Sequence, residues 1–297
     1  MFKIIGQERA KPYLKGGRSG KNYWTKAKIK VVKKLLVPTD FSDAATNAVR
    51  YAGGLAAAMG AEMVIFHAYQ VVKTSEMFVS VREYIEEDLE SESKTLFDSL
   101  RKLFGEDLKV SYKYREGHPV DAIGLEARHG GYDLVVIGTT GQSSVEKFFM
   151  GSVAKGLLDA SPAPLLLVPH TAHFQPIRSI VVATEGQYLQ NPELFEPFMN
   201  WAGVFNSKVD LFYHRPEDEI ELDIEKHFTW DGIPFTLHIQ ESNEGTHEAL
   251  DRFFAEQHGD VLVLLHHHRE FWSRLFKSSF TREQTKHTRV PVLVLPI

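Results

Sequence analysis

A pattern that occurs twice along the chain most strongly limits what this sequence can fold into. Residues 164–169 read Pro-Leu-Leu-Leu-Val-Pro, and residues 291–296 read Pro-Val-Leu-Val-Leu-Pro, 127 positions later. At the same offset, the run Asp-Leu-Val-Val-Ile that begins at residue 133 corresponds to Asp-Val-Leu-Val-Leu at residue 260. Self-similarity at a fixed spacing is typical of a repeated structural unit. We therefore predict one unit that occurs twice, and a length of 297 residues suits two ordinary domains.

An upstream pair of segments shows how the two units differ. Residues 62–67, Glu-Met-Val-Ile-Phe-His, match residues 208–213, Lys-Val-Asp-Leu-Phe-Tyr, at an offset of 146. The second unit must therefore lack 19 residues between these blocks, and we place the deletion in its second helix. We predict a first domain over 31–170, a linker from Pro169 to Pro176 and a second domain over 176–297.

Short apolar runs alternate with amphipathic stretches in both units. This alternation predicts an α/β fold in which helices cover both faces of a parallel sheet. The predicted strands are 34–37, 63–68, 109–114, 134–137 and 165–168 in the first unit, and 179–182, 209–213, 235–239, 261–264 and 292–295 in the second. The predicted helices of the first unit are 43–59, 76–104, 119–129 and 152–160, and the second unit's first helix opens at Asn191-Pro192.

Composition and charge exclude several classes of protein. The chain has no cysteine, which excludes disulfide scaffolds, thiolate metal sites and cysteine nucleophiles. No apolar run reaches the roughly 18 residues that cross a bilayer, so we expect a soluble, cytoplasmic protein without a membrane partner. Residues 1–30 carry nine basic side chains and one acid, whereas the whole chain has a net charge of −5. We interpret residues 1–30 as a basic flexible arm, and the acidic remainder argues against nucleic acid as a partner.

Glycines follow the fourth predicted strand of the first unit. In a doubly wound sheet, ligands bind beyond the carboxyl ends of the strands, where the strand order reverses. Gly138 follows this strand, Gly141 comes three residues later, and Gly151-Ser152 opens the next helix. Free backbone N–H groups at a helix start attract anions, and glycine allows the anion to approach closely. These residues, with Val153, are therefore candidates for holding phosphates.

The glycine spacing resembles that of a known family. Gly-x2-Gly-x9-Gly-Ser from Gly138 to Ser152, the run Val-Pro-Thr-Asp-Phe-Ser over 37–42 and the closing Pro-Leu-Leu-Leu-Val-Pro strand resemble the universal stress protein family. The resemblance covers 31–170 and, more faintly, 176–297. It implies two tandem doubly wound domains, each with five strands in the order 3-2-1-4-5. It also implies that the two fifth strands pair, which covers two apolar edges and makes an intramolecular pseudo-dimer. A homodimer of whole chains stays open.

The resemblance also implies a function. It implies that the first domain binds ATP, alone or with Mg²⁺, and regulates a stress response through an unidentified protein partner. Pro38, Thr39 and Asp40 would line the adenosine side, and the backbone of Ala68 would meet the adenine edge. The phosphates would be held by Gly138, Gly141, Gly151, Ser152 and Val153.

The second unit departs from the glycine pattern. At corresponding positions, Leu265 replaces the first glycine, Ser278 replaces the third, and Glu185 replaces Asp40. Side chains then occupy positions where phosphates need contact with the backbone. We therefore expect that the second domain does not bind ATP and serves as the structural partner of the first.

Other interpretations of these residues point away from catalysis. Neither the Gly-x4-Gly-Lys phosphate loop nor the Gly-x-Ser-x-Gly nucleophile elbow occurs, so we assign no catalytic residue and expect at most weak ATP hydrolysis or autophosphorylation. His266-His267-His268 is interpreted as a polar loop without metal, because adjacent side chains diverge. His67 is interpreted as a hydrogen-bonded residue at a strand end. The alternative function is a scaffold or interaction protein of the same fold whose glycine loop binds nothing.

Overall fold

One mixed sheet runs through the structure, which is a computed structural model. It describes residues 3–5, 32–71, 80–139, 151–184, 188, 192–215, 235–241, 246–265 and 290–296. The strands of the first half are β2 (Lys34–Pro38), β3 (Glu62–Tyr69), β4 (Val110–Glu116), β5 (Leu134–Gly138) and β6 (Leu165–Val168). Those of the second half are β7 (Ser179–Thr184), β8 (Lys208–Arg215), β9 (Phe235–Glu241), β10 (Val261–Leu265) and β11 (Val292–Leu295).

The two halves have the same strand order. The first half reads β4-β3-β2-β5-β6 across the sheet and the second reads β9-β8-β7-β10-β11, with parallel pairing inside each half. Counted from the first strand of each half, both orders are 3-2-1-4-5, so the predicted fold class is confirmed. The order reverses between β2 and β5, which places a ligand crevice at the carboxyl ends of these two strands.

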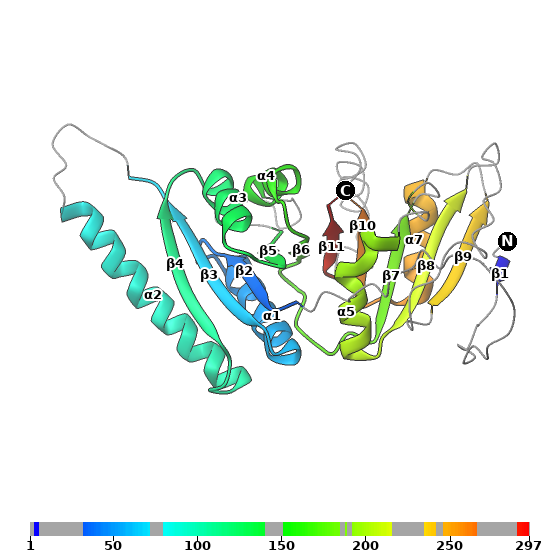
Figure 1. Ribbon diagram of the computed structural model, residues 1–297, viewed down its shortest axis with the longest axis horizontal. Coiled ribbons are helices and arrows are strands. Elements are labelled where there is room, and N and C mark those ends of the chain that lie inside the picture. Colours follow the sequence, from blue (N-terminus) through cyan, green and yellow to red (C-terminus); the bar gives the residue numbers. More distant parts are fainter. Residues whose placement is uncertain are drawn as a thin grey trace, which may run out of the picture.

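The two halves meet at their last strands (Figure 1). β6 pairs with β11 in the antiparallel direction, with Leu166 opposite Leu293. Every residue of both strands is buried. Two apolar edges that each half would expose on its own therefore cover one another, as the resemblance implied.

Helices form a layer on each face of the sheet. One face carries α1 (Asp43–Met59), α2 (Ser80–Phe104) and α5 (Glu196–Phe205), whose apolar residues share one core cluster. The other face carries α3 (Pro119–His129), α4 (Ser152–Ala160) and α7 (Thr246–Gln257), which share a second cluster. None of the helices in the described ranges combines the length and the apolar character that crossing a bilayer requires.

Most predicted element bounds agree with the structure, and one requires correction. α1, α3 and α4 begin and end where the sequence predicted. The segment after Asn191 is not an α-helix from its first residue, because Pro192–Phe195 forms a 3-10 helix and α5 begins at Glu196. The predicted deletion in the second unit, the three histidines and Glu185 lie outside the described residues.

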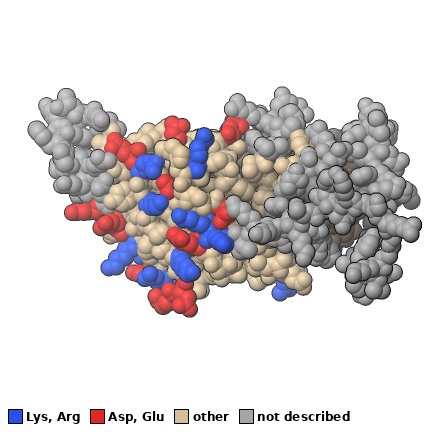
Figure 2. All heavy atoms as spheres, viewed as in Figure 1, with Lys and Arg blue, Asp and Glu red and all other residues tan. Residues whose placement is uncertain are grey.

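The predicted N-terminal arm contributes one short strand. β1 (Lys3–Ile5) pairs with β9 in the antiparallel direction at the edge of the second half (Figure 1). On the face shown in Figure 2, the acidic and basic side chains of the described residues are interspersed and form no basic patch.

The linker between the halves packs against helices from both. The side-chain amide of Asn47 in α1 donates a hydrogen bond to the linker carbonyl of Ala172 at 2.9 Å. The ring of Phe174 lies edge-on to Tyr51 of α1, with 5.5 Å between the ring centroids, and 6.2 Å from the ring of Phe205 in α5. Phe174 therefore connects the first half to the second.

Candidate functional site

A cavity of about 170 Å³ opens at the carboxyl ends of β2 and β5, where the strand order reverses. Eight of the nine predicted site residues line it, and the ninth, Gly141, lies outside the described residues. The eight are Pro38, Thr39, Asp40, Ala68, Gly138, Gly151, Ser152 and Val153. The sequence therefore predicted residues from four separate segments that the fold brings to one cavity.

The apolar wall of the cavity was missed by the sequence analysis. Ala45, Pro119, Ile123, Ile137 and Ala154 complete the lining. Ile123 and Ala154 belong to the core between the sheet and helices α3 and α4. Nothing in the sequence separates such residues from the rest of the core, because both follow the same helical spacing. The wall offers an apolar surface that suits the flat face of an aromatic ligand.

The start of α4 presents backbone N–H groups at this cavity. Gly151 precedes the helix and has no side chain to cap it. The first hydrogen bond of the helix runs from the amide of Lys155 to the carbonyl of Gly151 at 3.0 Å. The amides of Ser152 and Val153 come before that bond, so they have no partner within the helix. Together with the positive end of the helix dipole, they form a site that favours an anion.

Gly138 has a packing role in addition to its place at the cavity. A Cβ atom at this position would stand 2.9 Å from the carbonyl oxygen of Ala44, in the first turn of α1. Real Cβ atoms do not approach backbone oxygens so closely, so only glycine lets α1 pack this near to β5. The sequence analysis assigned Gly138 to phosphate binding alone.

The loop after β2 is held by hydrogen bonds of its own side chains. The carboxylate of Asp40 accepts bonds through one oxygen from the Ser42 amide at 3.1 Å and from the Ser42 hydroxyl at 2.6 Å. The Ser42 hydroxyl oxygen in turn accepts from the amide of Ala45 at 3.2 Å, which caps α1. Asp40 is therefore oriented before any ligand arrives, which reduces the entropic cost of binding.

His67 in β3 contacts this loop through its imidazole ring. Its Nδ1 atom is 2.8 Å from the carbonyl oxygen of Thr39. A carbonyl oxygen only accepts, so Nδ1 carries the proton and donates it. Burial lowers the pKa of His67, although the bond to Thr39 and the charge of Asp40 oppose this effect. The imidazole is therefore neutral at physiological pH. Its interpretation as a hydrogen-bonded residue is confirmed, although β3 continues two residues past it to Tyr69.

The lowered pKa of His67 predicts a loss of stability in mild acid. In the unfolded chain, the imidazole of His67 is protonated as the pH falls through about 6.5, the ordinary histidine pKa. In the folded protein it is protonated only at lower pH. Stability from this group is therefore complete above about pH 6.5 and is lost as pH falls through the folded pKa. We expect the free energy of unfolding, measured with urea at pH 7.5 and pH 5.5, to fall less in His67→Asn than in the wild type. Equal falls would contradict this assignment.

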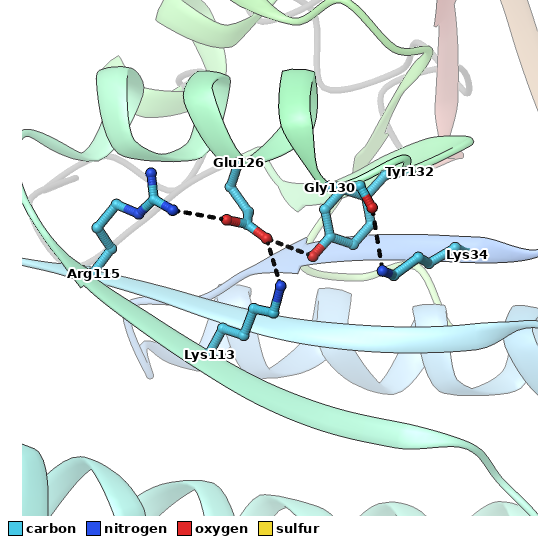
Figure 3. Close-up of polar contacts among 6 residues, drawn as sticks. All are labelled: Lys34, Lys113, Arg115, Glu126, Gly130 and Tyr132. Carbon is cyan, nitrogen blue, oxygen red and sulfur yellow. Dashed lines mark hydrogen bonds and ion pairs between the residues drawn. The ribbon is translucent and has the colours of Figure 1, made fainter.

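A buried carboxylate fixes α3, whose first turns border the cavity. Glu126 accepts hydrogen bonds from Lys113 Nζ at 2.9 Å, Arg115 Nη2 at 3.2 Å and the Tyr132 hydroxyl at 2.8 Å (Figure 3). Burial raises the pKa of Glu126, but the hydrogen bonds from Lys113 and Tyr132 and the charges of Lys113 and Arg115 outweigh it and lower the pKa. The carboxylate therefore stays ionised and holds α3 against β4, which positions Ile123 in the cavity wall.

Replacing Glu126 by glutamine should measure how much this carboxylate contributes to stability. Lys113 and Arg115 are about half exposed and can regain water, so we expect a loss of only about 1–2 kcal/mol of unfolding free energy. The difference from the wild type should shrink in acid, as the pH falls through the lowered pKa of Glu126. Urea unfolding at pH 7 and pH 3.5 checks both points, with exposed Glu87→Gln as the control. A loss no larger than that of the control would contradict the anchoring role.

The second half differs at the corresponding places. Leu265, which takes the position of Gly138, ends β10 and is buried.

The second half also contains a fully buried carboxylate in β8. Asp210 accepts a hydrogen bond from His238 Nε2 at 2.8 Å and forms an ion pair with Lys208 at 2.9 Å. The sequence analysis overlooked this group, although an aspartate inside an apolar strand was a readable signal. Among the described residues, no three histidine, aspartate or glutamate side chains gather as metal ligands would.

Comparisons with known proteins agree with this architecture. Residues 32–169 match the model of the Universal stress protein family. Universal stress protein MJ0531 of Methanocaldococcus jannaschii is 32% identical over 142 residues, which cover 46% of this chain and 81% of that protein. Universal stress protein YxiE of Bacillus subtilis is 30% identical over 144 residues, 46% of this chain and 97% of its own length. The chain belongs to the universal stress protein family.

A solved structure resembles both halves. The crystal structure of a universal stress protein from Archaeoglobus fulgidus DSM 4304 matches 89% of this chain and 98% of its own length, with a TM-score of 0.67. The sequence identity is 18%, so this likeness concerns the fold. In this chain, the likeness to that fold therefore extends beyond residues 32–169, which the family model covers.

Proposed function

We propose that the first half binds an adenine nucleotide, ATP with Mg²⁺, in the cavity between β2 and β5, and that this binding regulates a response to stress. The observation that carries the proposal is the uncapped start of α4 at the same cavity as Asp40 and Ala68. A ligand that fits needs an anionic group at one end, hydroxyls near a carboxylate and an apolar flat surface. A nucleotide has all three.

Each part of the nucleotide has a matching group in the cavity lining. The phosphates would accept hydrogen bonds from the amides of Ser152 and Val153 and from the Ser152 hydroxyl. Ribose hydroxyls would donate to the carboxylate of Asp40. The adenine ring would lie against the apolar wall that includes Ile123, with its polar edge toward the backbone of Ala68. Mg²⁺ would be held mainly by phosphate oxygens, because the cavity offers few protein oxygens for it.

The second half is proposed as a structural partner. Leu265 places a buried side chain where the first half has the backbone of Gly138, so this half would not bind the nucleotide in the same way. The pairing of β6 with β11 supports an intramolecular pseudo-dimer of two domains, 31–170 and 176–297. The regulatory effect would then reach an unidentified protein partner through a single chain. A sequence without cysteine suits the reducing cytoplasm.

Isothermal titration of the purified full chain with ATP and MgCl₂ tests this function. We expect saturable binding of one nucleotide per chain. Two nucleotides per chain would contradict the role given to the second half. No heat at millimolar ATP would overturn the proposal and favour a scaffold that binds no nucleotide.

A further inference from the structure

A histidine outside the cavity contacts the loop that forms its wall. Side chains alternate along a strand, so His67 in β3 points away from the face to which its neighbour Ala68 belongs. Ala68 lines the cavity and His67 does not. His67 instead donates from Nδ1 to the carbonyl oxygen of Thr39 at 2.8 Å, and its ring centroid is 5.1 Å from that of Phe41.

The loop that His67 contacts contains an unfavourable backbone conformation. Phe41 has φ of +59°, in the left-handed region that a bulky side chain seldom adopts. Such a residue costs about 1–2 kcal/mol relative to ordinary conformations, so its surroundings must hold it in place. The Phe41 amide donates to Thr39 Oγ1 at 3.0 Å, and the ring packs against His67. A backbone bond from Thr39 to Phe66 also ties the start of this loop to β3. The side chain of His67 adds a second contact from β3, to the carbonyl of Thr39 and to the ring of Phe41.

The left-handed turn decides which way the loop residues face. Thr39 continues the ladder of β2, because its amide donates to the Phe66 carbonyl at 2.9 Å. The chain then turns at Phe41 and enters α1 after Ser42, its capping residue. Thr39 and Asp40 line the cavity immediately before this turn.

We propose that His67 is a positioning residue of the ligand site, which holds the 39–41 loop so that Thr39 and Asp40 face the ligand. This inference rests on the proposed function, because the ligand used to test it is ATP. His67 is not a catalytic residue, because it does not line the cavity and its Nδ1–H group donates a hydrogen bond to the carbonyl oxygen of Thr39.

Three substitutions of His67 distinguish the effect of its hydrogen bond from the effect of its side-chain volume. In His67→Asn the amide nitrogen stands close to where Nδ1 was and still donates. His67→Leu has nearly the shape of asparagine but no donor. His67→Gln keeps a polar side chain, with its nitrogen nearer the position of Nε2, and serves if the leucine variant folds poorly.

Calorimetric titration with ATP and MgCl₂ measures the dissociation constant of each variant. We expect His67→Leu and His67→Gln to raise it about tenfold, which corresponds to one lost hydrogen bond, and His67→Asn to stay within about twofold of the wild type. A purely structural role would lower the urea midpoint of the variants and leave the dissociation constant unchanged. That result would overturn the proposal.

Hydrogen exchange of single amides tests the same proposal without any nucleotide. The amides of Phe41 and Ser42 donate to Thr39 Oγ1 and Asp40 Oδ1, inside the loop. We expect both to exchange at least about tenfold faster in His67→Leu but not in His67→Asn, while the Leu36 amide in β2 is unchanged. If the wild type binds no ATP and this pattern is seen, the proposed function fails and the positioning role stands. Unchanged exchange in the leucine variant overturns the positioning role, whether or not ATP binds.

Discussion

Replacing Gly151 by valine is expected to weaken the binding of ATP with Mg²⁺ at least a hundredfold without unfolding the protein. Gly151 has φ of −59° and ψ of 154°, a conformation that every residue adopts, so the substitution adds no backbone strain. Its side chain would instead occupy space in front of the amides of Ser152 and Val153. A hundredfold loss equals about 2.7 kcal/mol, which is within the range measured for hydrogen bonds to charged groups.

The chain offers a matched control for this experiment. Gly203 in α5 is exposed, and a Cβ atom added there meets nothing within 4 Å. Gly203→Val should therefore leave the dissociation constant measured by calorimetry unchanged. Gly138 is a poorer test, because a side chain there collides with α1 and disturbs the fold itself. Wild-type affinity in Gly151→Val would show that the start of α4 does not bind the phosphates.

Replacing Gly54 by alanine is expected to cause a large loss of stability. A Cβ atom added at Gly54 in α1 would overlap the ring of Phe174 in the linker. The ring itself contacts Tyr51 and Phe205, so a shift of the ring would disturb these contacts. Overpacking of this kind typically costs about 1–3 kcal/mol, and we expect a value near the upper end. The loss would show that the linker is part of the folded core and not a loose tether.

Gly203→Ala is the matched control for stability. It is the same substitution in a helix where the added methyl group meets open space. Alanine favours a helix interior over glycine by about 1 kcal/mol, so this variant should be slightly more stable than the wild type. Urea unfolding should therefore move the midpoint in opposite directions in the two variants. Midpoints that shift together would contradict the packing of Phe174 against α1.

Local signals in the sequence explain why three helices were predicted with correct bounds. α1 begins after the capping hydroxyl of Ser42 and ends at Met59, before Gly60, which adopts the left-handed conformation that favours glycine. α3 begins at Pro119 and α4 follows Gly151. The start of α5 was wrong because Asn191-Pro192 is an equally good start for a 3-10 turn.

The candidate site could be predicted only in part. Gly138, Gly151 and Asp40 belong to a recognisable pattern, and the fold brings them together because the carboxyl ends of adjacent parallel strands meet at one edge. The roles of Glu126 and Phe174 depend on contacts between residues far apart in sequence. A spacing pattern carries no information on such contacts, so only the structure shows them. The sequence does contain one indication of the role of Glu126, because this acid lies one turn after Ala122, on the buried side of α3.

A crystal structure of the full chain with ATP and Mg²⁺ tests the central claim most directly. We predict density for one nucleotide in the first half, with phosphate oxygens about 2.7–3.2 Å from the amide nitrogens of Ser152 and Val153. The ribose should lie beside Asp40. Only solvent at the start of α4 in crystals grown with excess nucleotide would contradict the claim, as would a nucleotide bound elsewhere on the chain.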